Sequence, residues 1–303
     1  MSIISKDKAK KLKEETLKGK SINNTMAEDM LKHFHKLHSI DRIFMDKEIE
    51  LLLIEQKKNE LNTIGRKPTY PTDLVKFNPS GASKTVMDLF LKAKGYKENS
   101  IMYPYHKRWV RNSTAVHEAI QTDLLYAEKL IKDTKFTVAR TEEGLPQWED
   151  NILKWVEIEH KGQRFILNGK ADGILRYEPT GQLVGFEIKT KSNTIGQVGF
   201  YRMKEPAEYH VEQTVAYFLL YGIRDQIIFY EGVVKDHWHK GSEAKIDVRS
   251  FGVHITDEMV NKVLDKWAYV SECVENDTMP EDRELGFFSG YKHLFNEEGA
   301  FIG

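Results

Sequence analysis

Apolar positions along the chain follow two periods, and each period predicts one kind of element. Apolar residues that recur every three to four positions predict helices over 26–40, 46–61, 78–96, 113–133, 205–222 and 256–276. Between them, alternating or continuous apolar runs predict strands over 152–160, 164–177, 183–191, 225–234 and 246–255. This order of helices, three strands, a helix, two strands and a helix is typical of an α/β fold with a mixed sheet.

Composition divides the chain into three regions. Residues 1–70 are rich in Lys, Glu, Leu and Ile, which predicts a helical accessory region that ends at a connector containing Gly65 and Pro68. Residues 71–275 hold all the predicted strands and form the expected main domain. Residues 276–303 are acidic, and we expect a solvated carboxyl-terminal tail there.

Length and composition argue for an ordered protein outside membranes. The chain has 303 residues, of which 40% are hydrophobic and 30% charged, and this balance argues against general disorder. The longest uncharged apolar stretch, residues 214–223, is about half of what a membrane-spanning helix needs. The first residues lack the apolar core of a signal peptide. We therefore expect a soluble, cytoplasmic protein with no membrane partner.

Net charge and cysteine content restrict the kinds of binding site that the chain can form. The formal net charge of -1 gives no overall attraction to a polyanion, so a nucleic-acid site must come from local clusters of Lys and Arg. Cys273 is the only cysteine, and one thiolate cannot form an internal disulfide or hold a zinc ion or an iron–sulfur cluster by itself.

Two carboxylates and a lysine form the most informative pattern. Side chains on a strand alternate between its faces, so Glu187 and Lys189 share one face while Ile188 points into the core. Asp172 lies on the preceding strand, where cross-strand pairing brings its carboxylate close to Glu187. Two adjacent carboxylates repel each other unless a cation lies between them, and Mg²⁺ prefers such oxygen ligands. The alternative is a hairpin with an exposed Glu–Lys pair of little energetic consequence.

Residues on the flanking helices extend this pattern. His117 lies on the helix before the strands with Gln121 one turn later, and an imidazole can bind Mn²⁺. Gln213 and Tyr217 lie one turn apart on the helix after the strands. Taken singly, either pair is also compatible with a structural role.

The ordered set resembles the RecB-type branch of the PD-(D/E)XK nuclease superfamily. His117 on a helix, Gly169 to Gly173 around Asp172, Glu187-Ile188-Lys189 on a strand and Gln213 with Tyr217 on the next helix follow that family's order. The resemblance covers about residues 78–235 and implies a restriction-endonuclease-like α/β core with a mixed central sheet flanked by helices. It implies Mg²⁺ or Mn²⁺ held by His117, Asp172, Glu187 and the main-chain carbonyl of Ile188. Lys189 would then assist the nucleophilic water, and Gln213 and Tyr217 would position the scissile strand or brace the site.

The sequence also departs from the family pattern. Iron–sulfur members of this branch carry cysteines before the histidine helix, whereas residues 78–90 contain none, so we expect no iron–sulfur cluster. The usual glycine before the histidine is replaced by Asn112 or Ser113, and Ser113 is the expected cap of the helix. A compact version of this kind resembles phage-encoded recombination exonucleases, which implies a location in the host cytoplasm. The sequence is compatible with a recombinase or single-strand-annealing protein as a partner, and with a homo-oligomer.

Basic and aromatic residues interleave at two candidate DNA-binding segments. One segment precedes the His117 helix, and the other is the loop that leaves the strand with Lys189. Cations can hold phosphates there while aromatic rings stack on unpaired bases. The alternatives are core residues at a helix start and an ordinary surface loop. The candidates are Lys107, Arg108, Trp109, Arg111, Lys191, Ser192, Tyr201 and Arg202.

These patterns together predict a metal-dependent deoxyribonuclease, with DNA as its partner. We expect an exonuclease that hydrolyses phosphodiester bonds from the ends of linear DNA in recombination or repair. The first alternative is a structure- or sequence-specific endonuclease that uses the same site. The second is a non-catalytic module that binds DNA ends or a protein partner.

Overall fold

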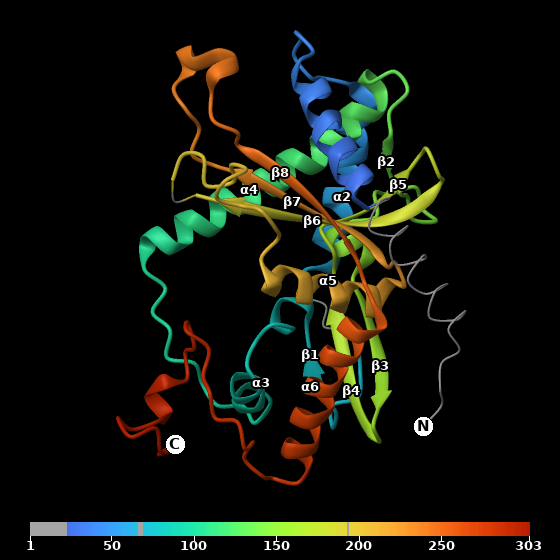
Figure 1. Ribbon diagram of the computed structural model, residues 1–303. Coiled ribbons are helices and arrows are strands. Elements are labelled where there is room, and N and C mark those ends of the chain that lie inside the picture. Colours follow the sequence, from blue (N-terminus) through green and yellow to red (C-terminus); the bar gives the residue numbers. More distant parts are fainter. Residues whose placement is uncertain (1–22, 66–68, 193) are drawn as a thin grey trace, which may run out of the picture.

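The computed structural model describes residues 23–65, 69–192 and 194–303 (Figure 1). The helices are one over residues 23–38, α2 (Lys47–Thr63), α3 (Val86–Ala93), α4 (Pro104–Leu130), α5 (Glu208–Tyr221) and α6 (Asp257–Glu275). Short 3-10 helices are η1 (Pro79–Gly81), η2 (Glu149–Ile152), η3 (Trp238–Glu243) and η4 (Lys292–Leu294). Within the described ranges, no helix combines the length and the apolar composition needed to cross a membrane.

The strands form two mixed sheets. The smaller sheet has the order β1 (Val75–Phe77), β4 (Gln163–Gly169), β3 (Lys154–His160). The larger sheet has the order β2 (Phe136–Val138), β5 (Gly173–Tyr177), β6 (Gln182–Lys191), β7 (Asp225–Gly232), β8 (Val248–His254). Strands β1 and β4 pair in parallel, as do β6 and β7, and the other neighbours are antiparallel. The predicted α/β class with mixed sheets and flanking helices is confirmed.

The prediction of one strand over residues 164–177 is wrong, because the chain changes sheets there. Strand β4 ends at Gly169, and β5 begins at Gly173 in the other sheet. A Cβ atom at Gly169 would lie only 2.5 Å from Cδ of Pro79, so only glycine fits where these two segments cross. Strands β1 and β2 were missed because three residues are too few to show a period.

Two helix starts also differ from the sequence-based expectation. Helix α4 begins at Pro104, nine residues before Ser113, because proline suits the first turn of a helix. Ser113 is therefore not a cap, and its Oγ lies 2.9 Å from Oγ1 of Thr190 on β6. Helix α3 begins after Thr85, whose hydroxyl accepts a hydrogen bond from the main-chain N–H of Asp88.

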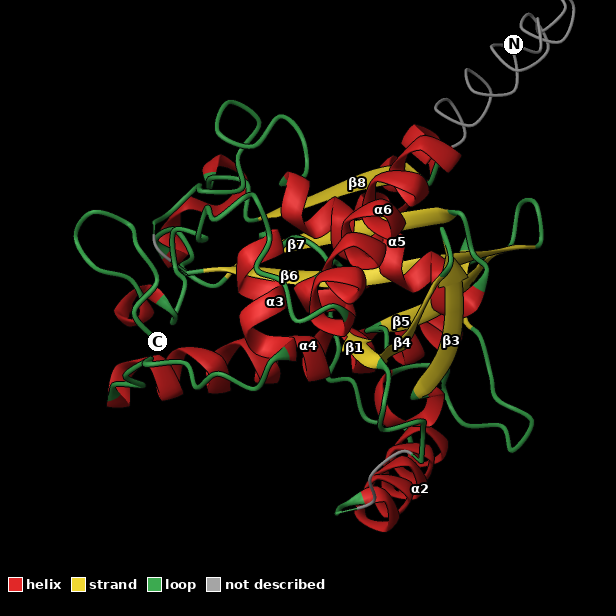
Figure 2. Ribbon diagram, turned by 90° about the horizontal axis from the view of Figure 1, so that it is seen from below, coloured by secondary structure: helices red, strands yellow, loops and turns green. Residues whose placement is uncertain are grey.

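Two apolar cores lie on opposite faces of the larger sheet. The first lies between the larger sheet and the layer of α4 and the amino-terminal helices (Figure 1). Phe186 and Ile188 belong to it. The second joins α3, α5 and α6 to the smaller sheet (Figure 2). Glu187 and Lys189 point away from the first core, towards α5. Strand β6 thus has a helix on each face at the level of these residues.

The amino-terminal helices belong to the first core. Met26, Met30, Phe34 and Leu37 are buried in it. The buried carboxylate of Asp29 accepts hydrogen bonds from side chains on or beside the sheet, including the Tyr177 hydroxyl at 2.6 Å. The described part of the accessory region is helical, as predicted, and it shares its apolar cluster with the sheet. Residues 1–22 and 66–68 of that region and its connector lie outside the described residues.

The carboxyl-terminal segment is anchored to the second core. Tyr291 is buried, and Phe295 and Phe301 pack against that core. The Asp88 carboxylate on α3 accepts hydrogen bonds from the Gly286 main chain and the Ser289 hydroxyl. The expectation of a solvated tail is wrong for these residues, because acidic composition concealed the aromatic positions that pack.

Truncation of Phe34 tests whether the amino-terminal helices are part of the main core. The Phe34 ring is 2% exposed and lies 4.7 Å from the Phe229 ring of β7, centroid to centroid. We expect Phe34→Ala to lower the free energy of unfolding by about 3–5 kcal/mol, because it opens a cavity against the sheet. Chemical denaturation followed by circular dichroism measures this.

Met45→Ala is the control, since Met45 lies in the same region but is 81% exposed. We expect its effect to stay below about 0.5 kcal/mol. A Phe34→Ala protein as stable as the control would show that these helices only rest on the surface of the main domain.

Candidate metal centre

The register of β5 against β6 places Asp172 beside the Glu187-Ile188-Lys189 segment. Gly173 pairs with Phe186, so Asp172 lies one position beyond this pair, at the start of β5. Its Oδ2 accepts a hydrogen bond of 2.8 Å from the main-chain N–H of Ile188. Gln121 of α4 donates to the main-chain oxygen of Asp172 at 2.8 Å. The expected approach of Asp172 to this segment of β6 is confirmed.

Strand alternation places the next two site residues on one face. Ile188 is fully buried in the first core, while Glu187 and Lys189 point to the other side and form an ion pair. The Lys189 ammonium also donates to Oε1 of Gln213 at 2.9 Å. Gln213 Nε2 in turn donates to the Tyr217 hydroxyl, one helical turn later, at 2.8 Å. Four sequence-predicted residues therefore form one chain of polar contacts between β6 and α5.

Burial makes the charge on Glu187 costly. Desolvation, and then the neighbouring Asp172 carboxylate, raise the pKa of Glu187 far above its ordinary value, although Lys189 opposes this shift. Its Oε2 is buried and has no hydrogen-bond partner among the described residues. Burial, and then the charges of Glu187 and Asp172, also raise the pKa of the Tyr217 hydroxyl well above its ordinary value. The Tyr217 hydroxyl and the Lys189 ammonium are thus groups of the site that act on the buried Glu187 carboxylate.

His117, another predicted ligand, approaches Asp172 from α4. Its Nδ1 lies 3.6 Å from Oδ2 of Asp172. Burial lowers the pKa of His117, but the charges of Asp172 and Glu187 outweigh this effect and raise it above its ordinary value. Helix α4 supplies the imidazole because its buried half packs on the sheet, one turn before Gln121.

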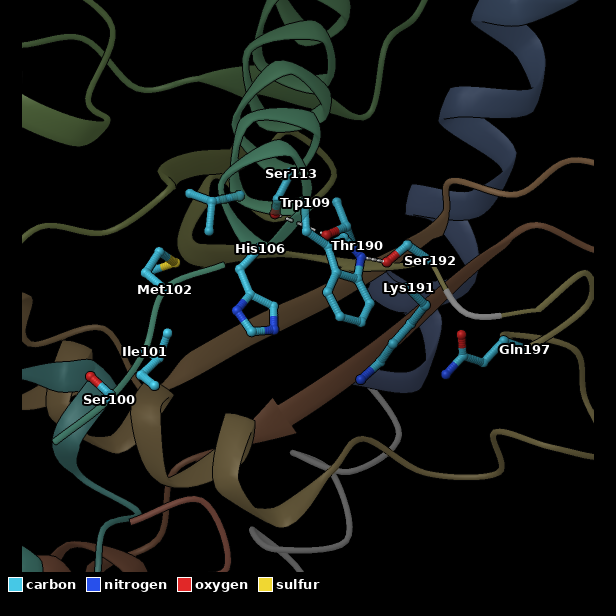
Figure 3. Close-up of a pocket in the computed structure, with 11 residues that line it drawn as sticks. Ser100, Ile101, Met102, His106, Trp109, Ser113, Thr190, Lys191, Ser192 and Gln197 are labelled. Atoms are coloured by element: carbon cyan, nitrogen blue, oxygen red, sulfur yellow. Dashed lines mark hydrogen bonds between the residues drawn. The ribbon is translucent and has the colours of Figure 1, made fainter. Parts of the chain in front are cut away.

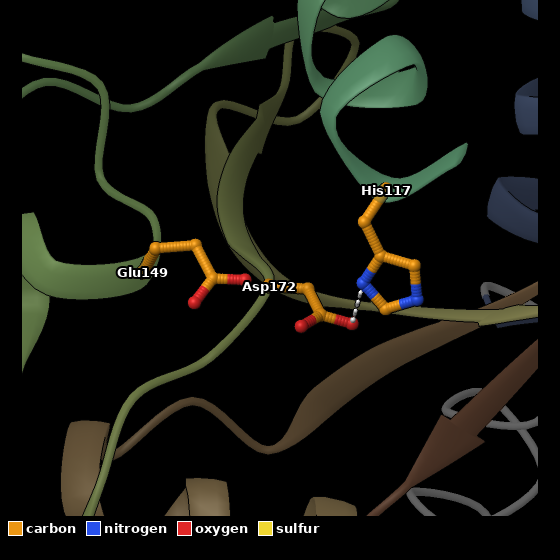
Figure 4. A group of neighbouring side chains, drawn as sticks. All are labelled: His117, Glu149 and Asp172. Atoms are coloured by element: carbon orange, nitrogen blue, oxygen red, sulfur yellow. Dashed lines mark ion pairs between the residues drawn. The ribbon is translucent and has the colours of Figure 1, made fainter. Parts of the chain in front are cut away.

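Glu149 joins this group, although the sequence did not predict it. Ligand atoms of His117, Glu149 and Asp172 all lie within 4.8 Å of one another (Figure 4). Glu149 begins η2 with a φ of 47°, and its N–H donates to the main chain of Ala171 at 2.9 Å. Lys170 lies 3.0 Å from its carboxylate. No sequence signal marks this residue, because an irregular loop and a left-handed backbone bring it into place.

The donor set fits a hard divalent cation. Carboxylates and an imidazole are the ligands that suit Mg²⁺ and Mn²⁺. The buried negative charge of Glu187 is what such a cation would neutralise. The His117, Glu149 and Asp172 group can therefore hold a metal ion. Glu187, a predicted ligand, is not part of this group, although the charges of Asp172 and His117 act on it.

His117 and Glu149 line a pocket of about 340 Å³. A second pocket, of about 640 Å³, lies where β6 ends and is lined by Thr190, the residue after Lys189. Trp109 and Val110 line it from α4, Met102 lines it from the segment before α4, and Lys191 lines it from β6 (Figure 3). The Trp109 indole N–H donates to the Ser192 hydroxyl, which fixes the ring at the edge of the pocket. Three of the predicted DNA-binding residues, Trp109, Lys191 and Ser192, are thus gathered here.

The other five DNA-binding candidates lie elsewhere. Lys107, Arg108 and Arg111 are exposed on the first turns of α4 and do not line this pocket. Tyr201 and Arg202 line a separate pocket of about 320 Å³ with Lys245. Residues 104–112 form the start of α4 instead of the expected loop. Successive residues of a helix point in different directions, so Lys107, Arg108 and Arg111 do not face the pocket that Trp109 lines.

Comparisons with known proteins give no family. No family model matches the sequence, and no curated protein matches it. Among solved structures, a protein designated SSO0001 is 14% identical, with a TM-score of 0.41, over 85% of this chain and 100% of its own. The alkaline exonuclease LHK-Exo from Laribacter hongkongensis is 12% identical, with a TM-score of 0.41, over 67% of this chain and 90% of its own. At these TM-scores the likeness assigns neither a family nor an activity.

Neutralising Asp172 tests the metal centre directly. Asp172→Asn keeps an acceptor for the Ile188 N–H but removes the negative charge that Asp172 contributes to its group with His117 and Glu149. We expect Mn²⁺ affinity, measured by isothermal titration calorimetry, to fall at least about tenfold, because carboxylate charge provides most of the attraction for such a hard cation.

Asp123→Asn is the matched control. Asp123 also pairs with a histidine, at 2.8 Å from His38, but it lies outside the group. Its Mn²⁺ affinity should stay at the wild-type value. Equal affinities for the two variants would show that Asp172 is not a ligand.

Proposed function

We propose that this protein is a metal-dependent deoxyribonuclease that hydrolyses phosphodiester bonds from DNA ends, in recombination or repair. The observation that carries the proposal is the pair of adjacent carboxylates, Asp172 and Glu187, with the Lys189 ammonium bound to one of them. A structural ion pair would need only one carboxylate. The second carboxylate adds a negative charge to a buried site, and this costs stability unless a cation offsets it.

In this proposal, Asp172, Glu187, His117 and the main-chain carbonyl of Ile188 hold Mg²⁺ or Mn²⁺. The bound ion would supply charge neutralisation at the phosphate and a lowered pKa of its water. Asp172 is already oriented for this role by the Ile188 N–H, so the ligand geometry does not depend on a mobile side chain. Glu149 is a further candidate ligand.

In this proposal, Lys189 acts on the reacting groups. An ammonium has three N–H donors, and Glu187 and Gln213 accept two of them. The third is free to hold the attacking water or a phosphate oxygen as negative charge develops. We assign Lys189 this catalytic role.

Gln213 and Tyr217 position Lys189. The Gln213 amide accepts from Lys189 through its oxygen and donates to Tyr217 through its nitrogen, so its orientation is fixed at both ends. Because the pKa of Tyr217 is raised, its hydroxyl stays protonated and can donate in turn. The family resemblance implied that Gln213 and Tyr217 either brace the site or position the scissile strand. Their hydrogen bonds favour the first of these two roles.

The pocket at the end of β6 supports action on DNA ends. Trp109 is half-exposed over a mainly apolar space, and Lys191 supplies a cation at its border. An unpaired base can stack on such a ring, whereas a base within a duplex is already stacked. Bases become unpaired most readily at an end, which favours an exonuclease over an enzyme that cuts internally.

Digestion of labelled DNA tests the proposed activity. A linear duplex, labelled separately at each 5′ and 3′ end, is compared with the same DNA as a closed circle, in Mg²⁺, in Mn²⁺ and in chelator. We expect metal-dependent loss of the linear form alone, with the order of label release giving the direction. Cutting of the circle would instead indicate an endonuclease. Failure to cut either form would overturn the proposal and leave a binding module.

Lys189→Gln tests the catalytic assignment. We expect the single-turnover rate to fall on the order of 10²–10³-fold, because a donor to the developing charge is lost. DNA affinity, measured without metal, should change by less than a few fold.

Lys266→Gln is the matched control, because Lys266 on α6 is also ion-paired and has a similarly buried side chain, 18% exposed against 19% for Lys189. Its rate should stay near the wild-type value. A Lys189→Gln enzyme within a few fold of this control would refute the role of Lys189.

A further inference from the structure

Two loops leave the same end of the larger sheet. Strands β6 and β7 are parallel, so the loop after β6 and the loop between β7 and β8 emerge side by side (Figure 1). We call residues 194–205 and 235–247 the paired loops. They touch at Gly196, where an added Cβ would lie 3.1 Å from the Lys245 side chain. A pocket of about 320 Å³ lies between them.

The paired loops expose aromatic rings that the fold does not use. Tyr201 is 96% exposed and Trp238 is fully exposed, while Phe200 is more than half exposed. Neither Tyr201 nor Trp238 makes a ring contact with another side chain of the described residues. Exposed rings gain nothing for stability, and here they gather on two adjoining loops that also carry cations, a combination that suits a binding surface.

Cations accompany these rings. Arg202, Lys240 and Lys245 lie on the paired loops, and none forms an ion pair with a carboxylate in the part of the chain that the structure describes. The nearby carboxylate of Asp236 accepts hydrogen bonds from main-chain N–H groups of its own loop, those of His237 and Lys245. The surface therefore has positive charge available for an anionic partner.

A buried arginine braces the first of the paired loops. The Arg249 guanidinium on β8 lies 4.1 Å from the centroid of the Phe200 ring and 5.0 Å from that of Phe251. It also donates to the main-chain oxygen of Met203 at 3.2 Å. Cation–π contacts and this hydrogen bond hold the guanidinium, which has no carboxylate partner within the described ranges. The loop with Tyr201 and Arg202 is thereby fixed in place, although it is exposed.

We propose that the paired loops bind single-stranded DNA next to the metal centre. Stacking rings together with unpaired cations suit a single strand, because its bases offer free faces and its phosphates carry charge. The bases of an intact duplex hide those faces. Gln197, on the same loop, lines the Trp109 pocket, so a strand that enters this pocket continues onto the paired loops (Figure 3). The choice of DNA as the polyanion rests on the proposed function.

Binding without cleavage tests this inference. Asp172→Asn protein in chelator is titrated into fluorescent oligothymidylate of about 20 nucleotides, long enough to cover such a site, and into a hairpin duplex of equal length. Tyr201→Ala and Trp238→Ala should each raise the anisotropy-derived Kd for the single strand about tenfold, the loss of one stacked base. The Kd for the duplex should stay within about twofold.

Phe288→Ala is the matched control, since Phe288 is 94% exposed but lies in the carboxyl-terminal segment. Its Kd should equal that of the background protein. Unchanged Kd values for both loop variants would overturn the inference, as would equal losses for the single strand and the duplex or an equal loss in Phe288→Ala.

This outcome is separable from that of the cleavage experiment. A protein that cuts DNA but binds the single strand normally without Tyr201 and Trp238 refutes the binding surface alone. A protein that cuts no DNA but loses single-strand affinity in these variants refutes the nuclease proposal alone.

Discussion

The pairing of β5 with β6 brings two carboxylates together in a poorly hydrated space. The neighbouring groups of the site bind or neutralise these carboxylates. Asp172 is tied to the main chain of Ile188, while Glu187 is buried and shares its charge with Lys189. Lys189 neutralises only one of the two negative charges. The polar chain through Gln213 to Tyr217 directs the lysine, and burial, followed by repulsion from Asp172, keeps the pKa of Glu187 raised. A stable fold tolerates such an arrangement because it is confined to one strand pair between two apolar cores.

Local periodicity predicted the parts of the site that lie within single elements. Alternation along a strand placed Glu187 and Lys189 on one face, and helical spacing placed Gln213 and Tyr217 one turn apart. A two-residue period also predicted that Ile188 is buried. These features depend only on residues close in sequence, so the order of apolar and polar side chains was sufficient to predict them.

Features that depend on distant contacts were not predictable from the pattern. The sheet change at Gly169 follows from the crossing of Pro79, which is 90 residues away. Glu149 reaches the site through an irregular turn that has no periodic signature. The amino-terminal helices looked like an appendage because their composition is charged, yet the buried residues of each helix complete a core. In each case, contacts between residues far apart in the sequence determined the structure, and local sequence patterns do not report such contacts.

Helix α4 joins two regions of the surface in one rigid body. Trp109 borders the pocket and His117 borders the carboxylates, and both are on the same uninterrupted helix. Eight residues of α-helix span about 12 Å, and side-chain rotation cannot change that length. The buried half of the helix is clamped against the sheet through Ile120, Leu124 and Leu125. The helix therefore works as a rigid spacer, which fixes the separation of the Trp109 and His117 backbones along its axis whatever rotamers the two side chains adopt.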